Sequence, residues 1–246
     1  MLSKMLFSSL LALSITVLIV GCGRSDHDDE GNGRALSAVP APIETAAPVQ
    51  PAGKVFTYDF DKLPVSALPT IFSSVRTGAG SVGKWEILTD DSAPSKPNVL
   101  AQTSADSTDY RFPIVVSNER AFRDLELSVK FKAVGGHTDQ AGGLVFRYKD
   151  VNNYYVVRAN ALENNFRLYH VVKGNRQQFA GANLPVMTKQ WHELKVICIG
   201  NQITCFFDGK QAIQATDDTF KDAGKVGVWT KADSVTYFDD LTVTAK

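Results

Sequence analysis

Polar side chains that form directional hydrogen bonds recur at alternate positions in three strand-like runs, residues 143–148, 154–160 and 166–170. Successive residues of a β-strand face opposite sides of a sheet, so these polar residues are predicted to share one face. Arginine and asparagine hydrogen-bond hydroxyls or carboxylates, and tyrosine adds a ring with a polar tip. A solvated sheet face with incidental charges is the alternative. The residues of the predicted ligand face are Arg147, Arg158, Asn160, Arg167 and Tyr169.

Two loops are predicted to border this face. The first, residues 135–143, is rich in glycine and carries His137, Asp139 and Gln140. The second, residues 161–165, carries Glu163 and Asn164. Glycines let a backbone approach a bound molecule closely, although a plain surface connection is an equal alternative.

Asp139 and Glu163 are the carboxylate pair that these loops offer for acid–base chemistry. A glycosidase uses two carboxyl groups ~5 Å or ~6.5–9.5 Å apart. The two residues come from separate loops, so the sequence does not fix their separation. Together with His137 they form the predicted catalytic set, if the protein is an enzyme.

Twelve short strands are predicted to hold these residues. They show period-2 alternation and are separated by Gly, Asn and Asp turns, with no long amphipathic helix after residue 21. This pattern predicts an all-β sandwich or barrel. The predicted strands are 55–60, 84–88, 111–116, 125–132, 143–148, 154–159, 166–172, 191–199, 202–207, 211–216, 225–230 and 236–244.

The first 21 residues have the layout of a secretory signal: Lys4, an apolar run over residues 6–20 and a small residue, Gly21. Cys22 follows directly, and the sequence Leu-Ile-Val-Gly-Cys resembles the lipobox of bacterial lipoproteins, in which the cysteine is lipidated. An ordinary signal peptide or a membrane-spanning helix is the alternative, but the apolar run is shorter than the ~20 residues that a span needs. We therefore expect a lipid-anchored protein of the bacterial cell envelope. Gly23 favours the outer membrane, because inner-membrane retention is associated with aspartate at this position.

Residues 22–53 are predicted to form a tether, and residues 54–246 the folded domain. The tether has an acidic cluster at 26–30 and four prolines between 40 and 51, and too few apolar residues to fold alone. The whole chain has 26 basic and 26 acidic residues. This balance argues against a nucleic-acid partner, which normally needs a strongly basic face.

Cys198 and Cys205 lie in a predicted hairpin that turns at Gly200-Asn201. A two-residue turn pairs Cys198 with Ile203 and places Cys205 on the diagonal, roughly 7 Å away, which is long for a disulfide. A four-residue loop would place the two cysteines opposite each other. We favour two buried thiols, because the two-residue turn is the commoner one, and keep the disulfide as the alternative.

The order of the strands adds a family resemblance over residues 55–243. Its most specific parts are residues 152–165, NNYYVVRANALENN, and residues 231–240, KADSVTYFDD. The chain resembles the concanavalin A-like, laminin-G-like jelly roll, and more narrowly the 3-keto-disaccharide hydrolase (family-16 glycoside hydrolase-like) family. The resemblance implies a two-sheet antiparallel β-sandwich that binds a carbohydrate on one sheet face. The carbohydrate-binding residues expected are Arg147, Arg158, Asn160, Asn164, Arg167, Tyr169 and Gln140.

The resemblance leaves the reaction open. Family-16 glycosidases carry Glu-x-Asp-x-x-Glu or Glu-x-Asp-x-Glu on a strand, and neither pattern is found here. A 3-keto sugar has an acidified C–H beside its ketone, so cleavage could proceed by elimination, with His137 or Glu163 as base and an arginine polarising the ketone. A carbohydrate-binding module without turnover, or a structural or adhesive envelope protein that binds a protein partner, is the alternative.

A structural calcium ion is a further expectation that the jelly-roll resemblance suggests. The first and last strands of related folds lie side by side, and here they carry Asp59, Asp61, Asp239 and Asp240. Carboxylates and backbone carbonyls are the oxygen ligands that calcium prefers. Edge charges that discourage aggregation between sheets are the alternative.

Overall fold

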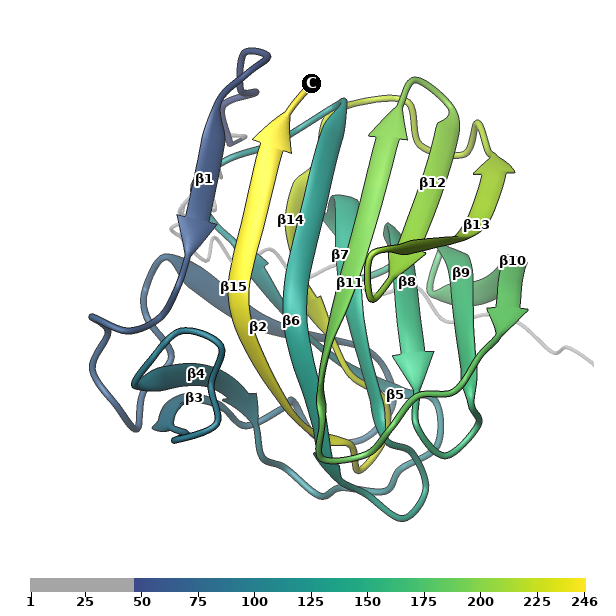
Figure 1. The fold of residues 1–246 in the computed structure, drawn as a ribbon. Helices are drawn as coiled ribbons and strands as arrows, with labels where there is room; N and C mark the ends of the chain where they lie inside the picture. Colours follow the sequence, from purple (N-terminus) through teal and green to yellow (C-terminus); the bar gives the residue numbers. More distant parts are fainter. Residues whose placement is uncertain (1–46) are drawn as a thin grey trace, which may run out of the picture. The chain divides into compact units, whose positions relative to one another are not determined.

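The computed structural model describes residues 47–246, which form fifteen β-strands and their connecting loops (Figure 1). None of these residues is helical, so this part of the chain has no helix that could cross a membrane. Cys22, the predicted signal segment and most of the predicted tether lie outside the described residues.

The strands form two antiparallel sheets. The eight-stranded sheet has the order β13 (Lys210–Thr216), β12 (Gln202–Phe207), β11 (Trp191–Ile199), β6 (Leu125–Gly135), β15 (Val235–Ala245), β4 (Asn98–Gln102) and β3 (Trp85–Thr89), with β1 (Val55–Tyr58) paired to the second half of β15. The seven-stranded sheet has the order β10 (Asn175–Asn183), β9 (Asn165–Val172), β8 (Asn153–Asn160), β7 (Ala141–Asp150), β14 (Lys225–Trp229), β5 (Arg111–Ser117) and β2 (Phe72–Gly78).

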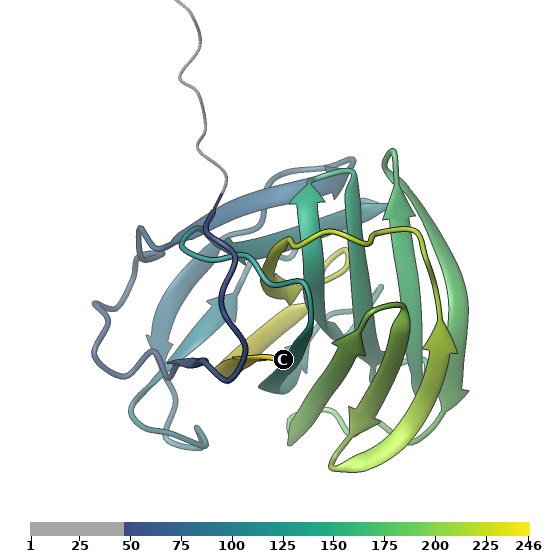
Figure 2. The same ribbon diagram turned by 90° about the horizontal axis from the view of Figure 1, so that it is seen from above.

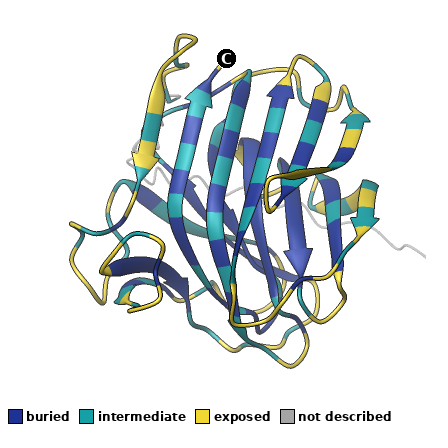
Figure 3. Ribbon diagram, in the orientation of Figure 1, coloured by how far each residue is buried: buried dark blue, intermediate teal, exposed yellow. Residues whose placement is uncertain are grey.

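The two sheets stack face to face, with the main hydrophobic core between them (Figures 1 and 2). In β6, Leu125, Leu127, Val129 and Phe131 face this core, and the residues between them are partly exposed. The same alternation appears as bands of dark blue and teal along β6, β11 and β15 (Figure 3). The predicted two-sheet antiparallel jelly roll is therefore confirmed, and the resemblance that implied it gave the right architecture.

The seven-stranded sheet has a second cluster of buried residues on its outer side, opposite the main core. This sheet is strongly curved, because the Arg176 guanidinium on edge strand β10 lies 4.5 Å from the ring centroid of Phe112 on β5, although four strands separate β10 from β5. The Thr77 hydroxyl on β2 similarly lies 2.9 Å from the Tyr154 hydroxyl on β8. We call this outer side the concave face; it carries Tyr154, Arg158, Tyr169 and Trp229.

All twelve predicted strands are present, and three strands were missed. β4 is buried along its whole length, so it shows no alternation. β2 and β10 are edge strands, in which partly exposed polar residues replace the apolar positions that alternation needs. A pattern of period two detects strands with one wet and one dry face, and these three strands do not have that form.

The hairpin of β11 and β12 has the predicted two-residue turn. Cys198 pairs with Ile203, and Cys205 pairs with Val196. Both cysteines are free and buried in this structure, the arrangement favoured from the two-residue turn. Burial raises the pKa of Cys198 to about 11 and that of Cys205 further.

The chain contacts the sandwich earlier than the predicted domain boundary at residue 54. Val49 forms a parallel bridge with Ala121, and the Gly53 amide donates to the Ala245 carbonyl at 2.8 Å. Residues 47–53, assigned to the tether from their composition, therefore pack on the domain in this structure.

Candidate ligand-binding site

The concave face gathers polar side chains where β14, β7, β8 and β9 lie next to one another. Gly143 on β7 is opposite Trp229 on one side and Arg158 on the other, and Arg158 is opposite Arg167. A Cβ atom at Gly143 would lie 3.0 Å from the Arg158 Cβ and 2.8 Å from the Val157 carbonyl oxygen. The glycine therefore makes room for the arginine in the middle of the face.

Arg158 is the centre of this polar group and is 4% exposed. Its Nη2 donates to Glu163 at 2.8 Å and to the Tyr169 hydroxyl at 3.0 Å, and its Nη1 donates to the Asn165 amide oxygen. The Asn165 amide nitrogen in turn donates to Glu163 at 2.9 Å. These bonds fix the plane of the guanidinium, since each Nη group has at least one partner.

Glu163 connects the buried arginine with solvent, because its side chain is 39% exposed. Burial raises its pKa, but the positive charge of Arg158 and the hydrogen bonds from Asn165 and Arg158 outweigh this effect and lower the pKa below its usual value. The carboxylate is therefore ionised at neutral pH, the form that accepts hydrogen bonds or a proton.

Asp139 and Asn160 contact each other beside this group. The sequence predicted Asn160 on the face and Asp139 in a loop that borders it. Asp139 is 1% exposed; it accepts a 2.6 Å hydrogen bond from the Asn160 amide and forms a 2.7 Å ion pair with Lys231. The charge of Lys231 also lowers the pKa of Glu163. Lys231 therefore forms an ion pair with one of the two predicted catalytic carboxylates and interacts electrostatically with the other.

Asp233 holds the loop that carries Asp139. Its carboxylate accepts hydrogen bonds from the backbone amides of His137 at 2.7 Å, Thr138 at 3.0 Å and Asp139 at 3.0 Å. Burial opposes the ionisation of Asp233, but these three amides together lower its pKa. Because one carboxylate satisfies three consecutive N–H groups, it fixes the loop conformation next to the site.

Arg176 closes the aromatic side of the concave face. Its guanidinium carbon lies 4.5 Å from the ring centroids of both Phe112 and Tyr169 and 5.6 Å from that of Trp229. Burial lowers the pKa of Arg176. Burial also raises the pKa of the neighbouring Tyr154 to about 12. The face thus combines two arginines with a wall of aromatic rings.

Two guanidinium nitrogens in this group have no hydrogen-bond partner although they are buried. They are Nε of Arg158 and Nη1 of Arg176. Buried polar groups in folded proteins nearly always have a protein, water or ligand partner, so each of these donors is available to an acceptor from outside the chain. Both belong to the concave face, and the two guanidinium groups contact the same ring, that of Tyr169.

The prediction that Arg147 shares this face is wrong. Arg147 lies in a β-bulge of β7 with a φ of 46°, which breaks the alternation after Phe146. Its side chain is 1% exposed and donates to the carbonyls of Arg123, Phe220 and Gly200 and to Asp124. The residue joins three loops at one end of the sandwich instead of facing a ligand.

The remaining predicted residues lie around the polar group with different roles. Arg167 donates to the Ala182 carbonyl and to Asn183 on β10, at 2.6 Å each. Asn164, with a φ of 49°, shapes the turn before β9 and accepts from the Val186 amide, and Gln140 donates to the Gly136 carbonyl. His137 is exposed in the loop held by Asp233.

Three of the four aspartates predicted as calcium ligands accept hydrogen bonds from protein donors, and the fourth, Asp240, is partly exposed. Asp239 is fully buried and accepts from the amide and hydroxyl of Ser95, while Asp61 accepts from the Asn98 amide and Asp59 from the amide of Asp61. Within residues 47–246, no three His, Cys, Asp or Glu side chains gather as a metal site. The calcium prediction thus gains no support from the geometry.

The family comparison decides the relationship that the sequence motifs suggested. Residues 78–244 match the 3-keto-alpha-glucoside-1,2-lyase-like domain family. The chain belongs to this family. The predicted membership is confirmed, and the matched region includes all residues of the polar group on the concave face. Comparison with curated proteins gives no matching relative.

Solved structures with the same fold as this lyase-like domain include several carbohydrate-binding proteins. The carbohydrate-binding module CBM66 from Bacillus subtilis has a TM-score of 0.58 at 20% identity, covering 72% of this chain and 96% of the module. The carbohydrate recognition domain of Emp47p has a TM-score of 0.54 at 12% identity, covering 80% and 99%. The mannose- and calcium-bound lumenal domain of VIP36 has a TM-score of 0.50 at 12% identity, covering 78% and 89%. At these identities the likeness establishes the fold.

Five contributors to the group were not predicted from the sequence: Asn165, Arg176, Trp229, Lys231 and Asp233. Arg176 lies on the undetected strand β10, and Trp229 has the alternation typical of a core residue. Lys231 and Asp233 were part of the segment that carried the family resemblance, but nothing in their spacing connected them to Asp139. The sequence signal for Lys231 and Asp233 is their position, as Lys-x-Asp, directly after the predicted strand 225–230.

Proposed function

We propose that the domain binds a carbohydrate on the concave face, with Arg158 as the central hydrogen-bond donor. The observation that carries this proposal is the buried Nε of Arg158, which lacks an acceptor beside Tyr169 and the ionised Glu163. A sugar hydroxyl accepts from such a donor and can donate to the carboxylate. The carbohydrate-binding neighbours of the same fold support this choice.

A glycan array tests this function with the full chain in a detergent that contains no sugar. We expect the wild type to bind at least one glycan and Arg158→Ala to lose at least tenfold in affinity, since a buried charged hydrogen bond is worth about 1.5–3 kcal/mol. Arg123→Ala is the matched control, because Arg123 is exposed and contributes its backbone carbonyl to the fold. Equal glycan binding by wild type and Arg158→Ala would refute the proposed site.

Cleavage of a 3-keto-α-glucoside is the second candidate, and family membership is the observation that favours it. In this reaction the Glu163 carboxylate accepts the proton on C2, beside the ketone at C3. The electron pair forms the C1–C2 double bond, the C1–O bond breaks, and the leaving alkoxide takes a proton from water. In this proposal Arg158, whose Nη2 donates to Glu163 at 2.8 Å, polarises the ketone oxygen.

Turnover of a 3-keto-α-glucoside separates the two candidates. If the domain is a lyase, Glu163→Gln should reduce turnover at least 100-fold and change glycan affinity by a small factor, because the amide still hydrogen-bonds but is not a base. Leu162→Ala, at an exposed side chain of the same loop, is the control. Absence of product with the wild type would leave the binding function and exclude the lyase.

The third class, a structural or adhesive protein, requires an exposed apolar surface. The large apolar residues exposed in the described part of the chain are spread over separate strands and loops: Val49, Val55, Val65, Val82, Tyr110, Leu162, Met187 and Ile199. This distribution gives no reason to prefer a protein partner over a glycan.

We further propose that the domain works outside the cytoplasm, anchored by lipid on Cys22, with the outer membrane as its location. The support is the lipobox-like sequence that ends at this cysteine. Cell fractionation of the wild type and Cys22→Ala tests the anchor, and the expected result is loss of the protein from the membrane fraction in the variant.

A further inference from the structure

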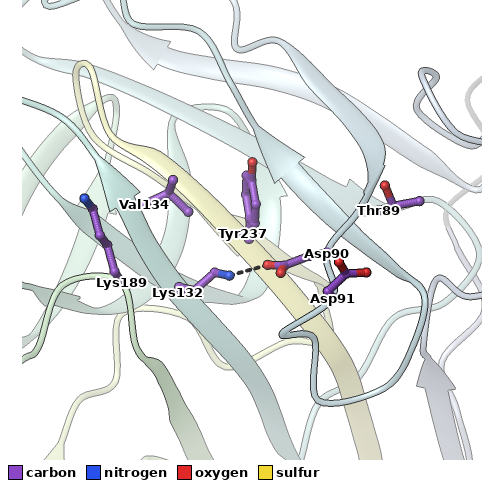
Figure 4. Close-up of a pocket in the computed structure, with 7 residues that line it drawn as sticks. All are labelled: Thr89, Asp90, Asp91, Lys132, Val134, Lys189 and Tyr237. Atoms are coloured by element: carbon purple, nitrogen blue, oxygen red, sulfur yellow. Dashed lines mark hydrogen bonds and ion pairs between the residues drawn. The ribbon is translucent and has the colours of Figure 1, made fainter.

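The eight-stranded sheet carries a pocket on its outer face, in the layer opposite the concave face. Its volume is about 450 Å³, and its lining residues are Thr89, Asp90, Asp91, Lys132, Val134, Lys189 and Tyr237. Figure 4 shows these side chains around the Lys132–Asp90 ion pair, which joins β6 to the segment after β3. We call this the β6–β15 pocket.

Two aromatic rings flank Lys132, and one of them, that of Tyr237, lines the pocket. Trp191 on β11 and Tyr237 on β15 are the direct cross-strand neighbours of Lys132. The Lys132 ammonium lies 5.0 Å from the Trp191 ring centroid and 5.3 Å from that of Tyr237. Both aromatic residues are partly exposed, so their rings present apolar surface to solvent.

The loop after β3 holds this arrangement in place. Lys132 donates to the Ser92 hydroxyl at 2.7 Å as well as to Asp90, and the Trp191 Nε1 donates to the same hydroxyl at 3.2 Å. Three elements distant in sequence therefore meet in one hydrogen-bonded group. Such a built site differs from a surface on which charged side chains are scattered, because its groups are oriented before a ligand arrives.

Charged groups for a ligand remain beside the rings. Asp91 and Lys189 line the pocket and are exposed, and neither side chain has a hydrogen bond or ion pair to another residue in the described range. The pocket holds two aspartates and two lysines, so its charges balance. This balance favours neither an anion nor a cation.

We propose that the β6–β15 pocket is a second saccharide site that binds a neutral sugar unit. An aromatic ring stacks on the apolar C–H face of a pyranose, while a free carboxylate and a free ammonium group hydrogen-bond its hydroxyls. The volume lies within the ~300–1,000 Å³ of small-molecule pockets. With the proposed site on the concave face, the domain would contact two sugar units from opposite sheets.

Glycan-array binding by the full chain, in the same sugar-free detergent, tests the second site with single-site variants. We expect Arg158→Ala to keep binding to at least one neutral glycan, and Tyr237→Ala to reduce that binding at least tenfold. Tyr237→Phe is the matched control, because it keeps the ring and should bind within about twofold of the wild type. Circular-dichroism melting of each variant separates loss of a contact from loss of the fold.

The outcomes of the two proposals are distinct. The second site is refuted if Tyr237→Ala and Tyr237→Phe bind every neutral glycan equally well. This holds whether the array shows binding at the concave face or no binding at all. The concave-face function fails instead if Arg158→Ala leaves all glycan binding unchanged. Stronger binding of anionic than of neutral glycans through Tyr237 would also overturn the proposal.

Discussion

Replacement of Arg147 by alanine provides the sharpest test of the distinction between a structural and a binding arginine. One guanidinium donates to the carbonyls of Arg123 at 2.9 Å and of Phe220 and Gly200 at 2.6 Å each, and to Asp124 at 3.3 Å. These acceptors come from three loops that belong to both sheets. We therefore expect Arg147→Ala to lower the stability of the sandwich and to leave glycan affinity unchanged.

The size of the effect follows from these four contacts. Each hydrogen bond from a charged donor contributes about 1.5–3 kcal/mol, which sets an upper limit of about 6–12 kcal/mol for the set. Arg123 and Gly200 are exposed, so water can replace the donor at their carbonyls after truncation. Two of the four hydrogen bonds then account for the loss, at about 1.5 kcal/mol each, so we expect the free energy of unfolding to fall by about 3 kcal/mol. For a domain of this size, 1 kcal/mol corresponds to about 2–4 °C, so Tm should fall by about 10 °C.

Urea unfolding followed by circular dichroism measures this loss, with Arg123→Ala as the exposed control. A second variant, Arg147→Lys, keeps the charge but reaches fewer acceptors and should fall between the two. A loss below about 1 kcal/mol for Arg147→Ala would refute the structural role. Reduced glycan binding by the folded variant would show that Arg147 contributes to ligand binding, as the alternation of residues predicted.

The remaining predictions concern stability, thiol chemistry and anchoring. Burial raises the pKa of Asp239 to about 6, so its contribution to stability is full below about pH 4 and is lost as the pH rises through 6. Relative to Asp239→Asn, the wild-type free energy of unfolding should therefore fall by roughly 3 kcal/mol between these two limits. An equal pH dependence of the two proteins in urea unfolding would contradict this prediction. Asp233→Ala should speed hydrogen exchange at the amides of residues 137–139 at least tenfold, whereas unchanged exchange would mean that the loop does not need this carboxylate. Cys198 and Cys205 should resist iodoacetamide at pH 8 until the protein is unfolded, and a native mass lower by two hydrogens would reveal a disulfide instead. Mass spectrometry should find a lipid-modified Cys22 at the mature N-terminus, and an unmodified Cys22 would exclude the anchor.

The fold was predictable because most strands have one dry and one wet face. Alternation located β6, β11 and β15, which pack one side on the main core. It could not locate β4, which is buried on both sides, or β10, whose residues are mostly polar. Pairing partners depend on contacts between distant segments, so the two-sheet architecture came from the family resemblance and not from the pattern, and the order of strands within each sheet was not predicted.

The candidate site was predictable as far as alternation continued without interruption. Arg158, Asn160 and Tyr169 lie on the concave face because β8 and β9 pair without a register shift. Arg147 does not, because the bulge in β7 adds residues that reverse the facing of side chains. Arg176 reaches the site through the curvature of the sheet, which is a property of seven strands together and of no single segment.

The burial of the concave face sets a condition on any ligand. Arg158 and Tyr169 are almost fully covered, and Glu163 is the member of the group that leaves a large part of its side chain in solvent. A sugar therefore approaches from the Glu163 side. It can then take the free Nε of Arg158 as a donor while Nη2 keeps its bond to the carboxylate. Binding in this manner adds a hydrogen bond without breaking the ion pair, so it costs less than a mode in which Glu163 must leave. This geometry predicts that Glu163→Gln weakens binding far less than Arg158→Ala, and that order of effects separates a recognition site organised around the arginine from one organised around the carboxylate.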